Sequence, residues 1–179
     1  MVVYHGSLAE SRFSIFSPNK GKKRAFTNNT THSFFSSNKS IGEEYARYRK
    51  EGLYEVFLNI KDPIIQDYKG ADYTGELKKK SIVYDTTKGF KELGVFDTYD
   101  EATQYIKDNN ISNYYIANSK YVTNDTNYFL DLLNNSEKND GAILLNIDDS
   151  NSETVANDYI TSKPNQIKSA TDNVGTFST

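Results

Sequence analysis

Short runs of hydrophobic residues, separated by polar stretches, predict several strands along this chain. Tyr54 to Ile60 alternates between hydrophobic and polar residues, which is the period of a half-buried strand. Asp62-Pro63 ends that strand, because a proline restricts the backbone of the residue before it. The other runs that predict strands are residues 1–5, 33–37, 142–147 and 154–161, with shorter ones at 114–116 and 166–170.

Two capping-box patterns predict the beginnings of helices. Ser40 with Glu43 is one, and Thr98 with Glu101 is the other. We expect the first helix to run to about Lys50, with Gly52 as its stop, and the second to run to about Asn109.

A third helix is expected from Asp125 to about Leu133. Its apolar face would consist of Tyr128, Phe129, Leu132 and Leu133. Residues 64–97 follow neither the two-residue period of a strand nor the helical period clearly. Strands at both ends of the chain with helices between them predict an α+β fold.

Composition narrows the picture further. The 179 residues are enough for one domain with a hydrophobic core, and the absence of cysteine excludes disulfides and cysteine-based metal sites. The net charge of −3 gives no general attraction to nucleic acid or to anionic membranes, and no apolar stretch is long enough to span a bilayer. Because a hydrophobic strand begins at residue 2, we expect a domain taken from a longer polypeptide; a small protein that starts there is the alternative.

Three separated segments end predicted strands in polar or aromatic residues. The first is Tyr4-His5-Gly6-Ser7. The second runs from Phe34-Phe35-Ser36-Ser37 to Tyr45, which lies ten residues after Phe35. The third is Asn157-Asp158-Tyr159-Ile160, with Gln166 eight residues after Asp158. Each segment alone is also compatible with an ordinary core strand or helix, so the prediction depends on all three segments together.

Together these segments resemble the His-Tyr-carboxylate ADP-ribosyltransferases, the class of diphtheria toxin and the poly(ADP-ribose) polymerases. The resemblance implies a split antiparallel or mixed sheet with helices packed around it, and NAD as the substrate. It gives catalytic roles to His5, Tyr45 and Asp158. It also implies that NAD contacts residues at the ends of the first two strands, namely His5, Gly6, Ser7, Phe34, Phe35, Ser37 and Tyr45.

Two positions depart from the pattern of that class. Gly42 stands where the polymerases have a serine that binds the carboxamide, and Ser37 or Ser40 is a candidate substitute. Asp158 stands where they have glutamate, so the carboxylate reaches one methylene less far. Glu153 is the nearest alternative carboxylate, and we interpret Gln166 as structural.

A closer resemblance is to the ADP-ribosyltransferase-like domains in polyvalent proteins of phages and mobile elements. It rests on residues 1–7, 33–63 and 139–177, which include Phe57-Leu58-Asn59-Ile60-Lys61-Asp62-Pro63, Asp140-Gly141-Ala142-Ile143, Gln166-Ile167-Lys168-Ser169-Ala170 and Asn173-Val174-Gly175-Thr176-Phe177. We therefore expect one domain over residues 1–179, in which residues 64–138 form a variable helical or irregular region that is a candidate for target recognition.

The resemblance implies a mono-ADP-ribosyltransferase that cleaves NAD and modifies a macromolecular acceptor, with protein favoured over nucleic acid. The rivals are a catalytically inactive NAD-binding or structural module and an NAD glycohydrolase. The expected place of action is the cytoplasm of a host cell, reached in some cases as part of a larger phage or mobile-element protein. We predict no metal, because His32 has no partner at metal-ligand spacing, and we expect the basic run Lys20 to Arg24 to be a solvated loop.

Overall fold

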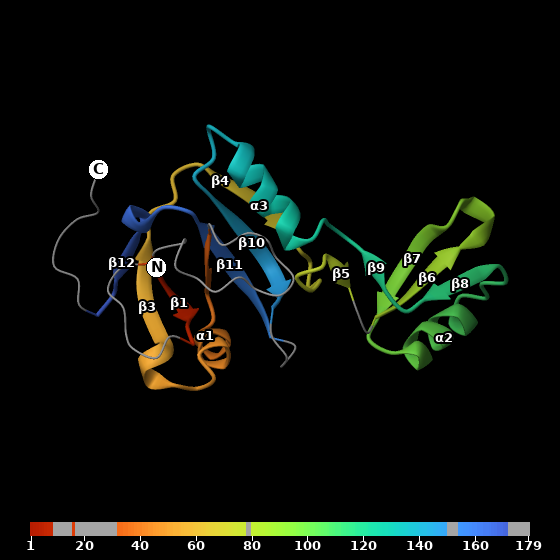
Figure 1. Ribbon diagram of the computed structural model, residues 1–179. Coiled ribbons are helices and arrows are strands. Elements are labelled where there is room, and N and C mark those ends of the chain that lie inside the picture. The colour runs from red at the N-terminus through yellow and green to blue at the C-terminus, as the bar shows by residue number, and fades with distance from the viewer. Residues whose placement is uncertain (9–15, 17–31, 78–79, 150–153, 172–179) are drawn as a thin grey trace.

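The main body of the molecule is one seven-stranded sheet in the order β12-β3-β1-β2-β11-β10-β4 (Figure 1). The structure is a computed structural model, and it describes residues 1–8, 16, 32–77, 80–149 and 154–171. Neighbouring strands are antiparallel except β10 and β4, which are parallel. The strands of this sheet are β1 (Val2–Gly6), β2 (Ser33–Ser36), β3 (Leu53–Leu58), β4 (Pro63–Asp67), β10 (Gly141–Asp148), β11 (Val155–Thr161) and β12 (Ile167–Ser169).

Two helices cover one face of the sheet. The helix α1 (Lys39–Tyr45) packs against β1, and α3 (Thr126–Asn135) packs against β10. Single 3-10 turns, η2 (Lys50–Gly52) and η4 (Pro164–Gln166), lead into β3 and β12. This large mixed sheet with helices against it confirms the α+β prediction.

A small unit, residues 80–117, lies to one side of the main body (Figure 1). It is a three-stranded sheet in the order β7-β6-β8, with α2 packed against it. A two-stranded ribbon of β5 and β9 connects it to the rest of the chain. The elements are β5 (Glu76–Leu77), β6 (Ser81–Asp85), η3 (Thr86–Lys88), β7 (Lys91–Phe96), α2 (Tyr99–Asp108), β8 (Tyr114–Ala117) and β9 (Lys120–Tyr121).

The hydrophobic core is divided by the main sheet, because successive side chains of a strand point to opposite faces. On the helix-covered face, buried residues of β10, β11 and α3 pack with Tyr68, and Phe34 packs against them. On the opposite face, Val3, Phe35 and Val56 form a second cluster together with Tyr54 and Phe16. The small unit has its own core, centred on Val83, Ala102 and Ile106.

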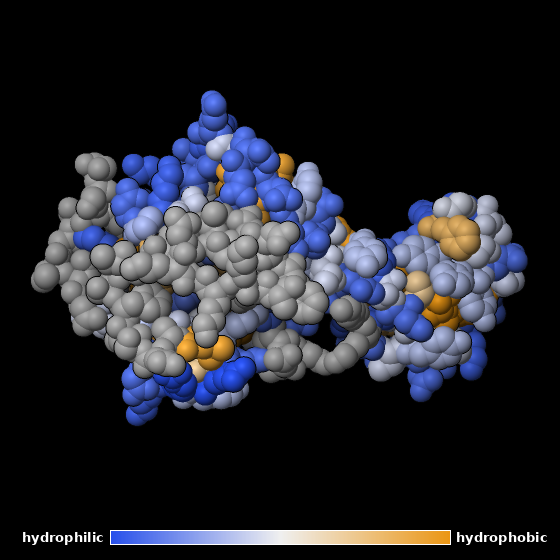
Figure 2. Space-filling view, in the orientation of Figure 1, coloured by the Kyte–Doolittle hydropathy of each residue, from blue (hydrophilic) through white to orange (hydrophobic). Residues whose placement is uncertain are grey.

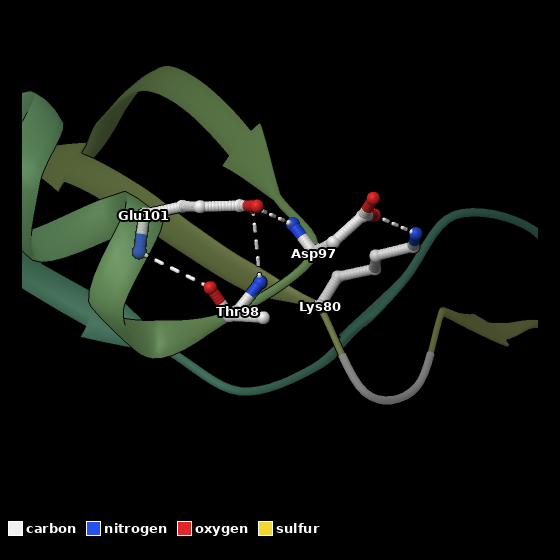
Figure 3. A network of polar contacts seen from close by, with 4 residues as sticks. All are labelled: Lys80, Asp97, Thr98 and Glu101. Atoms are coloured by element: carbon white, nitrogen blue, oxygen red, sulfur yellow. Dashed lines mark hydrogen bonds and ion pairs between the residues drawn. The ribbon is translucent and has the colours of Figure 1, made fainter.

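The entry into α2 follows the predicted capping box. Glu101 N–H donates to the Thr98 hydroxyl at 3.1 Å, and the Glu101 carboxylate accepts from the backbone N–H groups of Asp97 and Thr98. Figure 3 shows this network with the ion pair of Lys80 and Asp97 beside it, which ties the start of the small unit to the end of β7. The helix ends with Asn109 as its C-cap, as expected.

Two helix predictions are wrong. The N-cap of α1 is Asn38, whose side chain accepts from Ser40 N–H, and the helix ends at Tyr45 instead of Lys50. Arg47 and Tyr48 follow with positive φ angles, which an α-helix does not allow, so the helix stops well before Gly52.

The other wrong prediction concerns the buried face of α3. That face consists of Phe129, Leu130 and Leu133, whereas Tyr128 and Leu132 are exposed. Phe129 and Leu133 are buried as predicted, and packing against Ala142 and Leu144 of β10 adds Leu130 to the buried face. Residues 64–138, expected to be a variable helical or irregular region, contain short strands as well as α2 and α3.

Some expectations fall on residues outside those that the structure describes. These are the basic run Lys20 to Arg24 and the alternative carboxylate Glu153. Phe16 is buried in the core. No helix in the described part of the chain is long and apolar enough to cross a membrane.

Hydrophobic side chains reach the surface on both the main body and the small unit. Figure 2 shows a mostly hydrophilic surface over the described parts of the main body, with apolar residues visible there in places and also on the small unit. The exposed ones there include Phe90, Val95 and Tyr115. Phe90 and Tyr115 meet edge to face with their ring centroids 6.0 Å apart, so part of this surface is an aromatic pair.

We predict that Gly6→Ala destabilises the domain by about 3 kcal/mol, because overpacking of a rigid site is costly. A Cβ at Gly6 would lie 2.2 Å from the backbone oxygen of Gly42 and 2.5 Å from Cβ of Tyr45. Urea denaturation measures the free energy of unfolding. The matched control is Gly89→Ala, where the Cβ meets nothing within 4 Å and only the positive φ of 67° is unfavourable, at about 1 kcal/mol. Equal losses in the two variants would contradict the close helix–strand contact.

Candidate active site

The strands β1 and β2 meet over a very short stretch. A single residue pair, Tyr4 with Ser36, is in register between them, whereas β1 and β3 pair along the whole of β1. His5 spans the same junction, because its Nδ1 lies 2.7 Å from the backbone oxygen of Phe34. A carbonyl oxygen only accepts hydrogen bonds, so Nδ1 carries a proton. The His5 ring thus holds the two halves of the sheet together at the end of β1.

The His5 ring points to the face that carries the second core cluster. Its centroid is 5.2 Å from that of Phe16, 5.4 Å from that of Phe35 and 6.1 Å from that of Tyr54. Phe35 is buried there, whereas its neighbour Phe34 packs on the opposite face against the cluster around Tyr68. The two phenylalanines of the second segment are therefore divided between the two faces of the sheet.

Asp158 belongs to the helix-covered face. Tyr4 lies opposite Ser36, and Ser36 lies opposite Asp158, so these three residues form one row across three strands. Side chains in such a row point to the same face, and the two ends of the row are about 10 Å apart at Cα. His5 follows Tyr4 in β1, so its side chain points to the face opposite that of Asp158. The two side chains can come close to one another only at the β1–β2 junction.

Tyr45 reaches the same region from the end of α1. Its hydroxyl donates to the backbone oxygen of Asp149 at 3.3 Å, and the side chain remains 36% exposed. The negative charge of Asp149 in turn acts on Asp158, because it raises the pKa of the Asp158 carboxyl. The structure thereby connects Tyr45 and Asp158, from segments more than a hundred residues apart, through a residue that the sequence did not single out.

The carboxyl of Asp158 is almost completely buried. It is 3% exposed, it lies opposite Ser36 in the neighbouring strand, and its Oδ1 has no hydrogen-bond partner among the described residues. Burial raises its pKa well above the ordinary value of 3.8, and the negative charge of Asp149 raises it further, whereas the Ser36 hydroxyl acts in the opposite direction. This carboxyl therefore keeps its proton to a higher pH than an ordinary aspartate does.

The glycines near the site serve the contact between α1 and β1. A Cβ at Gly42 would lie 2.9 Å from Cβ of Tyr4, so this position has no room for a serine side chain without a shift of β1 or α1. Gly6 is equally constrained from the strand side. The backbone of Ser7 continues beyond the contact, where its N–H donates to the oxygen of Gly52 at 2.8 Å.

The two candidate substitutes for the missing serine have structural partners. The Ser37 hydroxyl accepts from Asn157 N–H at 2.9 Å and so links β2 to β11. The Ser40 hydroxyl donates to the side chain of Asn38 at the start of α1. Gln166 is buried and donates to the backbone oxygen of Asp140 at 2.7 Å, which agrees with a structural role. Glu153, the alternative carboxylate, lies outside the described residues.

Sequence reasoning missed Ser36 and Asp149. Ser36 lies between two residues of the second segment, and its register opposite Asp158 requires knowledge of the strand pairing. Asp149 immediately follows β10 in the connection to β11. The signal that could have found it is the acidic pair Asp148-Asp149 at the end of a predicted strand in the hairpin that leads to Asp158.

No metal site is evident among the residues that the structure describes. No three His, Cys, Asp or Glu side chains in these ranges are grouped to hold an ion. The pKa of His32 is lowered by burial.

Two surface cavities lie away from these residues. One of about 350 Å³ is lined by residues of the β9–α3 connection and its surroundings, and one of about 230 Å³ lies between the end of α1 and β3. Neither is lined by His5, Tyr45 or Asp158, so we locate the candidate site by its chemistry and not by cavity size.

The comparison with protein families places the chain in a known class. Residues 1–177 match the family described as ADP-ribosyltransferase in polyvalent proteins. The chain therefore belongs to this family, and the resemblance inferred from the sequence is confirmed. No curated protein and no solved structure gives a significant match to the chain.

We predict that Asp158→Asn removes a pH dependence of stability. Above the ordinary aspartate pKa the unfolded chain has lost this proton while the folded domain still holds it, so stability falls as pH rises towards the raised pKa. Urea titrations between about pH 5 and pH 8 should show this fall in the parent and a smaller one in the variant. Asp131→Asn, an exposed change on α3, is the control and should follow the parent. A parent whose stability rises over this range as steeply as that of Asp158→Asn would exclude a buried protonated carboxyl.

Proposed function

We propose that this domain is a mono-ADP-ribosyltransferase that cleaves NAD between nicotinamide and ribose and passes ADP-ribose to a macromolecular acceptor. Membership of the family supports transferase activity in general. The observation that carries the proposal is the connection of Tyr45 to Asp158 through Asp149, beside the β1–β2 junction that His5 spans.

In the proposed reaction, the bond between the ribose C1′ and the pyridine nitrogen breaks and nicotinamide leaves with the electron pair. The ribose becomes oxocarbenium-like, and the acceptor attacks C1′ and loses a proton. Asp158, when ionised, would accept a hydrogen bond from a ribose hydroxyl and stabilise the positive charge. Its Oδ1 supports this role, because it has no partner among the described residues and a buried oxygen without one is costly unless something binds it.

The other predicted residues would bind and orient NAD. His5 would hydrogen-bond a ribose hydroxyl, and the ring of Tyr45, which is partly exposed, would stack on the nicotinamide. Gly6, Ser7, Phe34, Phe35 and Ser37, at the ends of β1 and β2, are the other proposed NAD contacts. Phe34 and Phe35 lie on opposite faces of the sheet, so Phe34 is the one on the face of Asp158, and we propose that it faces Tyr45 across the nicotinamide.

A protein acceptor fits the surface better than a nucleic acid. The chain has a net charge of −3, and three lysines of the small unit and the adjoining β9 have acidic partners, in the pairs Lys80–Asp97, Lys88–Asp85 and Lys120–Glu92. Paired lysines are poor phosphate ligands. Exposed aromatic residues such as Phe90 and Tyr115 are typical of protein interfaces. The small unit is therefore our candidate for acceptor contact, in the cytoplasm of a host cell or within a larger protein delivered there.

The burial of Asp158 also supports two rival functions. A carboxyl that is protonated and shorter than glutamate favours slow chemistry, so water as the acceptor, or binding without reaction, is a second candidate. One assay separates the three functions: transfer releases nicotinamide and labels an acceptor, hydrolysis releases nicotinamide alone, and an inactive module does neither.

We predict that Asp158→Ala abolishes transfer while NAD binding persists, because the carboxylate acts chiefly in the transition state. The protein is incubated with NAD labelled on its adenosine part and with a bacterial lysate, and both nicotinamide release and label on macromolecules are measured. Nicotinamide release without label would indicate a glycohydrolase, and neither product would indicate an inactive module.

Undiminished transfer by Asp158→Ala would reject Asp158 as the catalytic carboxylate and make Glu153→Gln the next variant to test. Asp158→Glu, which restores the longer side chain, should keep or raise activity.

We predict that Tyr45→Ala weakens NAD binding about five-fold, whereas Tyr45→Phe does not. Loss of one stacked ring costs about 1 kcal/mol, and phenylalanine keeps the ring while it removes only the hydrogen bond to Asp149. The thermal shift caused by NAD or a nicotinamide analogue, followed by calorimetric titration, measures the effect. Equal binding by both variants and the parent would remove Tyr45 from the NAD site.

A further inference from the structure

We propose that the cavity of about 350 Å³ beside the β9–α3 connection binds an arginine side chain of the acceptor protein and so anchors that protein next to the candidate active site. That the arginine belongs to an acceptor rests on the proposed function. The affinity of the cavity for a guanidinium group does not, because it depends only on the residues that line the cavity. These are Thr74, Tyr121, Thr123, Asn124, Asp125 and Tyr128.

The cavity lies where the small unit joins the main body (Figure 1). Thr74 precedes β5, Tyr121 ends β9, and the other lining residues lead into the first turn of α3. A volume of this size is enough for one long side chain. A protein that contacts the small unit therefore comes close to the cavity.

The floor of the cavity is held by contacts between the two chain segments that cross there. Val122 N–H donates to the backbone oxygen of Gly75 at 2.9 Å. The hydroxyl of Tyr68, which is buried, donates to the backbone oxygen of Asn124 at 3.1 Å. A Cβ at Gly75 would lie 2.3 Å from the backbone oxygen of Thr123, so the two segments are in close contact. A ligand thus meets a site that is already formed, and little ordering cost opposes its binding.

Two tyrosine rings supply the aromatic part of the site. Tyr121 is 73% exposed and Tyr128 is 46% exposed. The ring of Tyr128 is held edge to face against Phe129, with the centroids 5.3 Å apart. The face of a tyrosine ring is electronegative and attracts a cation, and a planar guanidinium also stacks on it.

Asp125 supplies a negative charge to the same cavity. Its Oδ1 accepts from Tyr128 N–H at 2.9 Å as the N-cap of α3, and a carboxylate has room for further donors. The carboxylate also occupies the place at the helix start that an anion would take. No lysine or arginine is among the described residues that line the cavity. The cavity therefore favours a cation over an anion.

A second acid adds to the negative charge behind the cavity wall. Asp72 accepts from the N–H of Thr74 at 2.9 Å, so its carboxylate lies next to a lining residue. The acidic surroundings also act on Tyr68 below the floor: its pKa is raised mainly by burial and further by acids that include Asp125 and Asp72.

Arginine fits this combination of groups better than lysine does. A guanidinium stacks on an aromatic ring and donates two parallel hydrogen bonds to a carboxylate at the same time, which a compact ammonium group does not. Arginine stays protonated in proteins, so it is not the group that attacks C1′. The bound arginine is therefore an anchor, and another side chain of the acceptor receives the ADP-ribose.

The sheet relates the cavity to the candidate active site. Asp158, Leu144 and Gln66 are in register across β11, β10 and β4, so Asp158 and Gln66 are about 10 Å apart at Cα. Tyr68, which supports the cavity floor, follows Gln66 by two residues. An arginine in the cavity therefore holds its protein near the place of the proposed reaction.

The test is an NMR titration of the ¹⁵N-labelled chain, without NAD, with the amide of N-acetylarginine. The backbone amide signals of residues 121–128 should shift and saturate. The matched probe is the amide of N-acetylcitrulline, which has an uncharged urea in place of the guanidinium and should bind about ten-fold more weakly. No saturable shift in residues 121–128 with the arginine probe, or equal binding of the two probes, overturns the proposal.

Two variants connect the binding to the lining residues. Asp125→Asn removes the charge but keeps a good N-cap, and Tyr121→Ala removes an exposed ring. Each should weaken binding of the arginine probe by about three-fold. The controls are Asp131→Asn, an exposed charge on α3, and Tyr48→Ala, a ring 74% exposed on the main body, and both should bind as the parent does. Unchanged binding in Asp125→Asn and Tyr121→Ala overturns the proposal.

Transfer to protein separates this proposal from the proposed function. If the domain labels proteins of a lysate, Asp125→Asn and Tyr121→Ala should reduce that labelling by about three-fold at limiting lysate, while the thermal shift caused by NAD stays the same. Undiminished labelling in both variants refutes the anchoring role. If the arginine probe binds as predicted but the parent labels no acceptor, the guanidinium site stands and the proposed function fails.

Discussion

The close approach of α1 to the end of β1 is the contact on which the site depends. Gly6 on the strand and Gly42 on the helix leave no space between the two backbones for a side chain. This approach brings Tyr45, at the end of the helix, over the sheet beside the hairpin of β10 and β11. A wider separation would carry Tyr45 away from Asp149. The packing of the two glycines therefore determines where the Tyr45 ring lies.

The sheet brings the candidate residues together without directing them all to one side. The row of Tyr4, Ser36 and Asp158 faces the helices. The ring of His5 faces the core cluster on the other side of the sheet, and its Nδ1 contacts the backbone oxygen of Phe34 in β2. The His5 ring lies at the narrow β1–β2 junction, between the two halves of the sheet. Chemistry that needs both His5 and Asp158 is therefore confined to this junction.

Much of this could be predicted from the sequence because it is local. The strand periodicity, the capping box of Thr98 with Glu101 and the N-cap Asp125 depend on neighbouring residues alone. The early end of α1 could not, because Arg47 and Tyr48 take positive φ angles to meet tertiary constraints. Strand register was also hidden, so Ser36, which lies opposite Asp158, went unnoticed, as did Asp149, whose charge raises the pKa of Asp158.

The ribbon of β5 and β9 has a consequence for how this family can diversify. Glu76 pairs with Tyr121 and Leu77 with Lys120, so the chain leaves the main body and returns to it on two adjacent antiparallel strands. Everything between these points has its own sheet, helix and core. An insertion whose two ends emerge side by side can be exchanged, lengthened or lost by recombination with little strain on the rest. A change within the small unit would therefore leave the main sheet and its two core clusters in place.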